Sequence, residues 1–148
     1  MARIRSAGNE QTELRFMRLL RAHRITGWRR RQQMPGRPDF IFRNEKVAIF
    51  VDGCFWHGCL RHGRLPTSNE NYWLPKLART KKRDRQITSK LRRLGWRVLR
   101  IWQHDLKNET ILILRPRREL NRPARVISPT LSESPVRKRL PAEGLKAR

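Results

Sequence analysis

Acidic side chains are scarce in this sequence, and their scarcity indicates the kind of partner. The 148 residues contain 12 Asp and Glu against 36 Lys and Arg, which gives a formal net charge of +24. A surface of this charge attracts polyanions, and each phosphate that it neutralises releases counterions. Arginine predominates over lysine, and its forked donors suit phosphate oxygens and guanine edges. The composition therefore indicates a nucleic-acid partner, but it fits a nuclease and a structural RNA-binding protein equally well.

Long apolar runs are also missing. The longest, residues 47–51 and 111–114, are far too short to cross a bilayer, and the N-terminal Met-Ala-Arg-Ile-Arg lacks the apolar stretch of a signal peptide. We therefore expect a cytoplasmic protein with no membrane partner, associated with the nucleoid when it binds DNA. The sequence has only two cysteines, and in that compartment we expect thiols or metal ligands rather than a disulfide.

The apolar and turn-forming residues predict an α/β fold with a mixed sheet flanked by helices. Helices are expected over residues 10–24 and 75–94, where apolar side chains recur at helical spacing. Because a strand, a long helix and a strand form a right-handed crossover, the fourth strand should lie parallel to the third. The strands are expected over residues 28–32, 39–42, 46–52 and 96–102, with a turn at 35–38 and an irregular loop over 53–68.

The composition changes near residue 114. Residues 115–148 contain five prolines, and ten Lys and Arg against three Glu. Such a segment cannot supply a packed core. We therefore predict one folded domain over residues 1–114, followed by a basic, proline-rich and disordered tail over residues 115–148.

Both cysteines and two of the four histidines lie within residues 51–62. An isolated pair of cysteines is often inert, and that alternative stays open. Parallel strands, however, end at the same edge of a sheet, so the loop after the third strand should meet His104, just beyond the fourth. The cluster would then have the four ligands of a closed, structural zinc site and would staple the loop, with His57 left free for chemistry. The predicted zinc ligands are Cys54, Cys59, His62 and His104.

Three acids stand apart in this cationic chain: Glu13, Asp39 and Asp52. An acid that faces a polyanionic substrate is repelled unless a divalent cation lies between them, so these residues are candidate Mg²⁺ ligands. A helical Glu, a Pro-Asp before a strand and an acid at the end of the next strand follow the pattern of the PD-(D/E)XK nuclease fold. The lysine expected two residues after the last acid is absent, because Cys54 occupies that position. The alternative for each acid is a helix cap or a salt bridge to an arginine.

Several runs of this sequence resemble the very short patch repair (Vsr) DNA mismatch endonucleases. The resemblance covers roughly residues 1–106, and Gly-Cys-Phe-Trp-His at residues 53–57 is its most specific part. The other runs are Pro-Gly-Arg-Pro-Asp-Phe at 35–40, Phe-Val-Asp at 50–52, Tyr-Trp at 72–73, Arg-Asp at 83–84 and Gly-Trp-Arg-Val-Leu-Arg-Ile-Trp at 95–102. The resemblance implies a Mg²⁺-dependent, restriction-endonuclease-like enzyme that nicks one DNA strand at or near a T·G mismatch in very short patch mismatch repair.

The resemblance also implies roles for individual residues. Asp39 would be the principal Mg²⁺ ligand, and the backbone carbonyl of Val51 would complete the protein's share of the coordination. His57 would be the acid/base group, assisted by Glu13. The predicted zinc ligands fall where this family holds structural zinc.

Phe55 and Trp56 would form an aromatic wedge that enters the base stack, and Met1 would fill the place of the family's intercalating methionine. Unstacking a base step costs least at a mismatch, so a wedge would favour mismatched pairs. The alternative is that one or both rings pack on the zinc loop as a small core.

One departure from the family pattern concerns Asp52, which stands where the family has a second histidine. Asp52 could instead bind the metal directly, as a second carboxylate. This departure keeps open the alternative that the chain is a catalytically impaired, zinc-containing DNA-binding protein of the same fold. The expected partner is double-stranded DNA with a mismatch, bound by a monomer, with other mismatch-repair proteins as further candidates.

Overall fold

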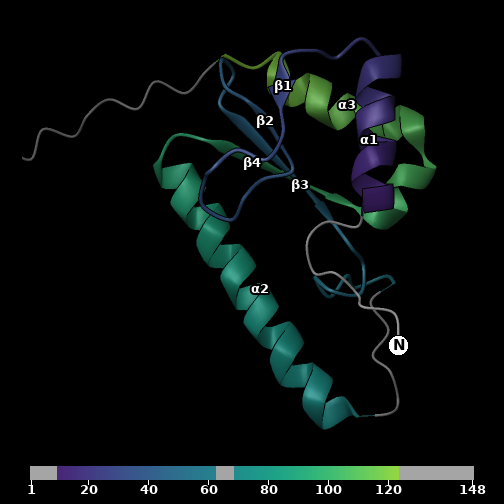
Figure 1. Ribbon diagram of the computed structural model, residues 1–148, viewed down its shortest axis with the longest axis vertical. Coiled ribbons are helices and arrows are strands. Elements are labelled where there is room, and N and C mark those ends of the chain that lie inside the picture. The colour runs from purple at the N-terminus through teal and green to yellow at the C-terminus, as the bar shows by residue number, and fades with distance from the viewer. Residues whose placement is uncertain (1–9, 63–68, 124–148) are drawn as a thin grey trace, which may run out of the picture.

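A computed structural model describes residues 10–62 and 69–123 of the chain. None of the helices in this part is long and apolar enough to cross a membrane. Figure 1 labels most of the helices and strands. In chain order the elements are α1 (Glu10–Ala22), β1 (Trp28–Arg29), β2 (Phe40–Phe42), β3 (Val47–Asp52), α2 (Glu70–Arg93), β4 (Arg97–Trp102), the 3-10 helix η1 (Gln103–Lys107) and α3 (Glu109–Leu120).

The four strands form one mixed sheet in the order β1-β2-β3-β4. The first two pairings are antiparallel, and β3 pairs with β4 in parallel, with Asp52 opposite Trp102. The predicted mixed sheet and its parallel pair are confirmed. β1 is shorter than predicted, since Arg31 adopts a φ of 53°, which is outside the extended region. The C-terminal ends of β3 and β4 lie at one edge of the sheet, where the predicted site residues gather.

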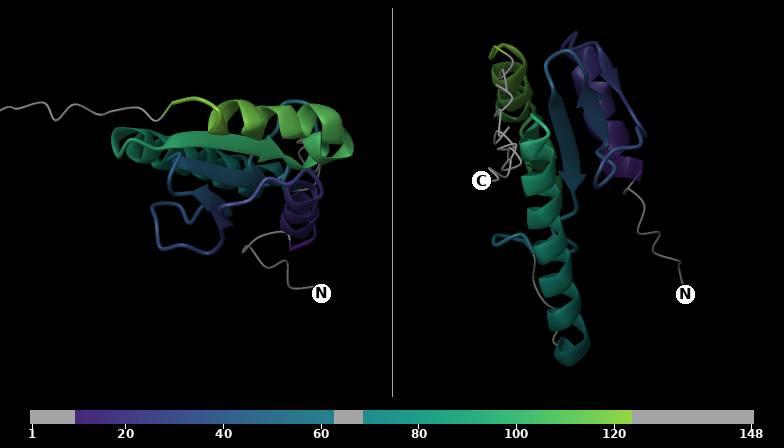
Figure 2. Two further views of the ribbon diagram at one scale, coloured as in Figure 1. Left: turned by 90° about the horizontal axis from the view of Figure 1, so that it is seen from above. Right: turned by 90° about the vertical axis from the view of Figure 1, so that its left-hand side faces the viewer.

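Helices cover the sheet on both faces. Phe16 and Leu20 of α1 and Leu112 of α3 pack on one face, and Leu91 of α2 packs on the other. α1 and α3 contact each other and lie near each other in Figure 1, and the right-hand view of Figure 2 shows the long α2 extending past the strands. Because β3 contacts helices on both faces, its side chains are buried almost without alternation, as its continuous apolar sequence predicts.

The helix α2 begins at Glu70, five residues earlier than predicted, and projects beyond the sheet (Figure 1). Pro75 therefore lies inside the helix and not at its start. A proline in a helix interior removes a backbone hydrogen bond. Ring contacts of Trp73 with Phe55 and Trp56, in the loop after β3, stabilise this first part of the helix.

The predicted boundary between domain and tail at residue 114 is wrong for residues 115–120, because they continue α3. Pro116 is buried in that helix, and Leu120 packs against the core with Leu112 and Ile113. The apolar area that these side chains bury offsets the cost of a proline within a helix. Residues 124–148, the rest of the predicted tail, lie outside the described part of the chain.

Candidate active site and metal centre

Asp39 and the end of β3 form the centre of the candidate active site. Asp39 directly precedes β2, and its Oδ2 atom accepts a hydrogen bond from the backbone N–H of Val51 at 2.7 Å. The N–H and C=O groups of one strand residue point to the same side of the strand, so the Val51 carbonyl faces the Asp39 side as well. The structure thus brings together the two groups predicted to share a Mg²⁺ ion.

Glu13 approaches this point from α1. Its Oε2 atom accepts a hydrogen bond from Nη2 of Arg30 at 2.6 Å. The pKa of Asp39 is raised to about 7, chiefly by burial and then by the negative charges of Glu13 and Asp52, against the opposing hydrogen bond from Val51. The three predicted acids therefore lie close enough to repel one another. A divalent cation among them would relieve that repulsion.

His57 lies between two carboxylates beside this group. Its Nδ1 atom is 2.6 Å from Oδ2 of Asp84, and its Nε2 atom is 3.7 Å from Oδ1 of Asp52. Arg100 of β4 joins the same two acids, with Nη1 donating to Oδ2 of Asp52 at 2.6 Å and Nη2 lying 3.4 Å from Oδ1 of Asp84. When Nδ1 carries the proton bound to Asp84, Nε2 is left as the base. The geometry fits the acid/base role predicted for His57.

The two carboxylates beside His57 have different electrostatics. Asp52 is only 3% exposed; burial raises its pKa, while His57 and Arg100 act in the opposite direction. Burial also disfavours the charge of Asp84, but its hydrogen bond with His57 and the charge of Arg100 outweigh burial and lower its pKa. Asp84 is therefore ionised at neutral pH and can accept a hydrogen bond from Nδ1 of His57. The metal-ligand role of Asp52 stays a prediction, since Arg100 engages one of its oxygens.

The sequence prediction missed Asp84 and Arg100 as site residues. Asp84 stands in the stripe of α2 that faces the sheet, between the buried Leu77 and Leu91. A carboxylate in such a stripe needs a partner, because burial of an unpaired charge is costly. Arg100 lies in a strand with apolar neighbours, and an arginine in such a strand could have been predicted as the partner of this carboxylate.

The four predicted zinc ligands come together at the edge shared by β3 and β4. One ligand atom from each residue lies within 4.8 Å of the others. The Sγ atoms of Cys54 and Cys59 are 3.2 and 3.6 Å from Nδ1 of His104, and neither cysteine forms a disulfide. The rings of His62 and His104 are 4.5 Å apart between centroids. In a tetrahedral zinc site the ligand atoms are separated by about 3.3–3.8 Å, so this cluster fits a zinc ion after small side-chain shifts.

The surroundings of His104 also suit a metal ligand. Its Nδ1 atom faces the two thiols, and its Nε2 atom is 3.4 Å from Oδ1 of Asp105. Histidines that bind metals commonly donate the other ring N–H to a carboxylate. Burial raises the pKa of the Cys54 thiol, and the neighbouring Cys59 raises it as well. Two thiolates at this separation would need a cation between them.

Comparison with known proteins identifies the relatives of this chain. Residues 1–62 match the family model described as DNA mismatch endonuclease Vsr. The chain is a homologue of the Vsr endonucleases. It is 41% identical over 76 residues to DNA mismatch endonuclease Vsr of Escherichia coli, a match over 50% of this chain and 48% of the relative. The resemblance seen in the sequence is confirmed.

Relatives named as nicking enzymes match the same chain. Type II nicking enzyme V.NaeI of Lentzea aerocolonigenes is 56% identical over 69 residues, which are 47% of this chain and 42% of the relative. Type II nicking enzyme V.NmeAIP of Neisseria meningitidis is 36% identical over 93 residues, which are 62% and 64% of the two chains. The chain therefore spans about half the length of the curated relatives that it matches. The mixed α/β sheet agrees with the restriction-endonuclease-like fold that the Vsr family implies.

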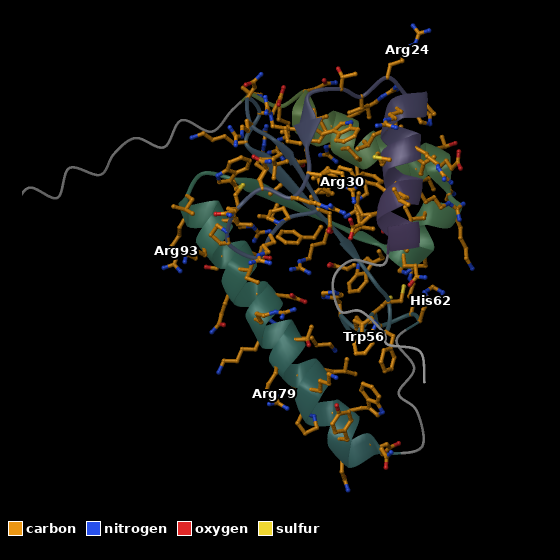
Figure 3. All side chains as sticks on the ribbon, in the orientation of Figure 1. Arg24, Arg30, Trp56, His62, Arg79 and Arg93 are labelled. Carbon is orange, nitrogen blue, oxygen red and sulfur yellow. The ribbon has the colours of Figure 1, made fainter. Side chains whose placement is uncertain are left out.

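The predicted wedge of this Vsr homologue is part of an aromatic cluster. The rings of Phe55 and Trp56 are 5.2 Å apart, and they lie 5.2 and 5.9 Å from the ring of Trp73 on α2. Lys76 lies 5.3 Å from the Trp56 ring centroid and 5.2 Å from that of Trp73. Both wedge rings are only partly buried, and Figure 3 shows Trp56 between α2 and His62. The rings thus contact α2 and keep an exposed side. Met1 lies outside the described residues.

Proposed function

We propose that this protein is a Mg²⁺-dependent DNA endonuclease that nicks one strand of a duplex at or near a T·G mismatch, in very short patch mismatch repair. The observation that carries the proposal is the position of His57. It is held by Asp84 and Asp52 next to the carboxylates predicted to bind metal. The homology to proteins named as mismatch and nicking endonucleases supports the reaction class.

The proposed roles of the residues follow from the geometry. His57, with Nδ1 bound to Asp84, takes a proton at Nε2 from the attacking water. Asp84 sets the tautomer of the ring, and the charge of Arg100 opposes the effect of burial on both neighbouring acids. Glu13 assists from α1. Together these groups hold and move one proton beside the scissile phosphate.

The cluster of Glu13, Asp39 and Asp52 fits a Mg²⁺ ion, since hard oxygen ligands gather there and the charges of Glu13 and Asp52 raise the pKa of Asp39. Asp39 and the Val51 carbonyl would hold the ion, with Asp52 as a further candidate ligand. When bound, it supplies an activated water and stabilises the charge of the leaving oxygen. We assign a structural Zn²⁺ ion to the cluster of Cys54, Cys59, His62 and His104.

The aromatic cluster is the proposed source of mismatch preference. Phe55 and Trp56 would enter the base stack where a T·G pair makes unstacking easiest. We propose that the protein acts as a monomer on mismatched double-stranded DNA, in the cytoplasm and on the nucleoid. Other mismatch-repair proteins are further candidate partners.

A DNA-binding protein that does not cleave is the second candidate. The salt bridge between Arg100 and Asp52 favours it, because it ties up a carboxylate that a two-carboxylate metal site would use. A structural RNA-binding protein has no need of the acids around His57.

A nicking assay tests the proposal. The parent and an Asp39→Asn variant are incubated with a T·G-mismatched duplex and with its fully paired counterpart, in Mg²⁺ or in chelator. We expect the parent to nick the mismatched duplex in Mg²⁺ alone, and the variant to bind it without cutting. Binding without cleavage by the parent would favour the second candidate, and equal cutting of both duplexes would remove the mismatch assignment.

A further inference from the structure

A groove lies along α2, and His57 of the candidate active site is one of its lining residues. Its volume is about 670 Å³. His57, Asp84 and Arg100 of the candidate active site line it, together with Trp102 of β4. The rest of the lining comes from α2 and from the loop after β3: Gly58, Leu60, Lys81, Arg85, Thr88, Ser89, Arg92 and Arg93.

The α2 residues of this groove form a stripe along the helix. Lys81, Arg85, Thr88 and Arg92 recur at intervals of three and four residues, which places them on one side of a helix. From residue 81 to residue 92 the helix rises by about 17 Å. One strand of B-form DNA advances about 3.4 Å per nucleotide along its axis. The stripe is therefore long enough to follow the backbone over about five nucleotides.

The cations of the stripe are free to bind an external anion. In residues 10–62 and 69–123, no carboxylate lies within ion-pair distance of Lys81, Arg85, Arg92 or Arg93. The acid of the groove, Asp84, is already engaged by His57 and Arg100. The groove thus presents unpaired positive charge along its length, and Thr88 and Ser89 add hydroxyl donors at its centre.

Lys81 lies where the stripe meets the loop that carries His57. Gly58, with a φ of +62°, lies against this side chain, and a Cβ atom at residue 58 would come within 2.2 Å of Cε and 2.8 Å of Nζ of Lys81. Glycine at this position therefore leaves the space through which Lys81 reaches the loop that carries His57. The Lys81 ammonium group also places a positive charge near the candidate active site, which lacks the lysine of the PD-(D/E)XK pattern.

We propose that this groove binds the phosphate backbone of one DNA strand on one side of the nick. The inference rests on the proposed function and adds the path of the substrate strand. A row of cations without base-reading amides fits a repeating phosphodiester, and such contacts position DNA without reading its sequence. A single free phosphate or mononucleotide would meet only part of a stripe of this length.

Two matched double variants of the full chain test the groove. Arg85→Gln with Arg92→Gln removes two charges from the groove side of α2. Arg83→Gln with Lys90→Gln removes two exposed charges at the same seven-residue spacing. The control positions are two residues earlier, about 200° around the helix, and they do not line the groove. All four side chains are exposed, so we expect melting temperatures close to that of the parent for both variants.

Binding is measured in chelator, over a range of salt, to a T·G-mismatched duplex and to the same duplex with single uncharged methylphosphonates along one strand. We expect the groove variant to reduce the slope of log affinity against log salt by about 2, since each phosphate contact contributes about 0.9. A methylphosphonate facing the groove should weaken the parent and the control variant, but not the groove variant. A large excess of free mononucleotide should not displace the duplex.

Equal salt slopes for the two variants, or equal sensitivity of both to every methylphosphonate, would overturn the groove assignment. Displacement by the mononucleotide would overturn it in favour of a small-anion site. The nicking assay in Mg²⁺ is independent of these outcomes. If the parent nicks DNA and both variants bind alike, the proposed function stands and the groove assignment is wrong. If the parent never nicks DNA and the groove variant binds weakly, the groove assignment stands and the proposed function is wrong.

Discussion

The Nδ1 atom of His57 lies 2.6 Å from Oδ2 of Asp84, although 27 residues separate them in the chain. One residue comes from the loop after β3 and the other from the long helix that packs on the sheet, so the contact depends on the complete fold. A carboxylate at this distance fixes the tautomer of the imidazole. The pair therefore gives His57 the orientation that an acid/base group needs.

Replacement of Asp84 tests this relationship. We expect Asp84→Asn to lower the nicking rate by about 10²-fold or more, since proton transfer by a positioned side chain contributes about 10²–10⁴-fold. Binding of the duplex in chelator should change little, because Asp84 is not a cation. Nicking rates as a function of pH should also show that the acidic limb of the parent profile moves, since the proposed base acts in its unprotonated form. An unchanged rate and an unchanged profile would show that Asp84 only supports the fold.

The raised pKa of Asp39 predicts a pH dependence of stability in the metal-free protein. Its pKa is about 7 in the folded state against a reference value of 3.8. Between these values the native state holds more protons than the unfolded state, so the free energy of unfolding falls as pH rises from about 4 to about 7. The charge of Asp39 is therefore destabilising above pH 7 unless a cation is bound.

Asp39→Asn should for this reason stabilise the protein at pH 8 in chelator, by on the order of 1 kcal/mol, with little effect at pH 4. Thermal unfolding of parent and variant at both pH values measures the difference, with Glu109→Gln as an exposed-acid control. Added Mg²⁺ should raise the melting temperature of the parent more than that of the variant. The same change in melting temperature at both pH values would contradict the prediction.

The sequence predicts the elements of this fold well where local pattern and topology agree. The apolar run of β3 and the crossover through α2 place Asp52 and His104 at one edge, and from that placement the Cys/His cluster could be predicted. The start of α2 could not be predicted, because Trp73 is held by ring contacts with a loop distant in sequence. The ion pairs of Arg100 with Asp52 and Asp84 were missed for the same reason, since only the packed fold brings these three side chains together.

Zinc should be present at one equivalent per chain in protein purified without chelator, and mild chelation should not remove it. His104→Ala should lower the zinc content and the melting temperature together, because binding at a closed site contributes directly to folding. His23→Ala is the matched control, since His23 lies outside the cluster. Metal analysis that finds no zinc in the parent would contradict the assignment.

Two truncations separate the tail from the domain. Removal of residues 124–148 should leave a folded protein that still nicks, with weaker binding to all sequences and a flatter salt dependence, because cations are lost. Removal of residues 115–148 should instead destabilise the protein by about 3 kcal/mol or more, since it deletes the buried Pro116 and the packed Leu120. Melting temperatures of the two proteins measure the difference. Equal stability would show that the second half of α3 is dispensable.

The aromatic cluster gives the sharpest test of mismatch recognition. Trp56→Ala, alone or with Phe55→Ala, should reduce the preference for mismatched over paired duplex by about tenfold, since a base–aromatic stack is worth about 1–3 kcal/mol. The ring contacts with Trp73 predict some loss of melting temperature as well. Nicking rates on both duplexes and the melting temperature are therefore measured on the same purified variant.

A second tryptophan separates recognition from stability. Trp96 is partly buried and packs against the α2 face of the sheet, away from the cluster, so Trp96→Leu should lower the melting temperature without changing the mismatch preference. Trp56→Phe keeps an aromatic ring and should retain much of that preference. If Trp56→Ala and Trp96→Leu both lose stability and leave the preference unchanged, the rings of the loop are a small core. Mismatch specificity would then lose its structural basis, while the cleavage chemistry assigned to Asp39 and His57 would stand.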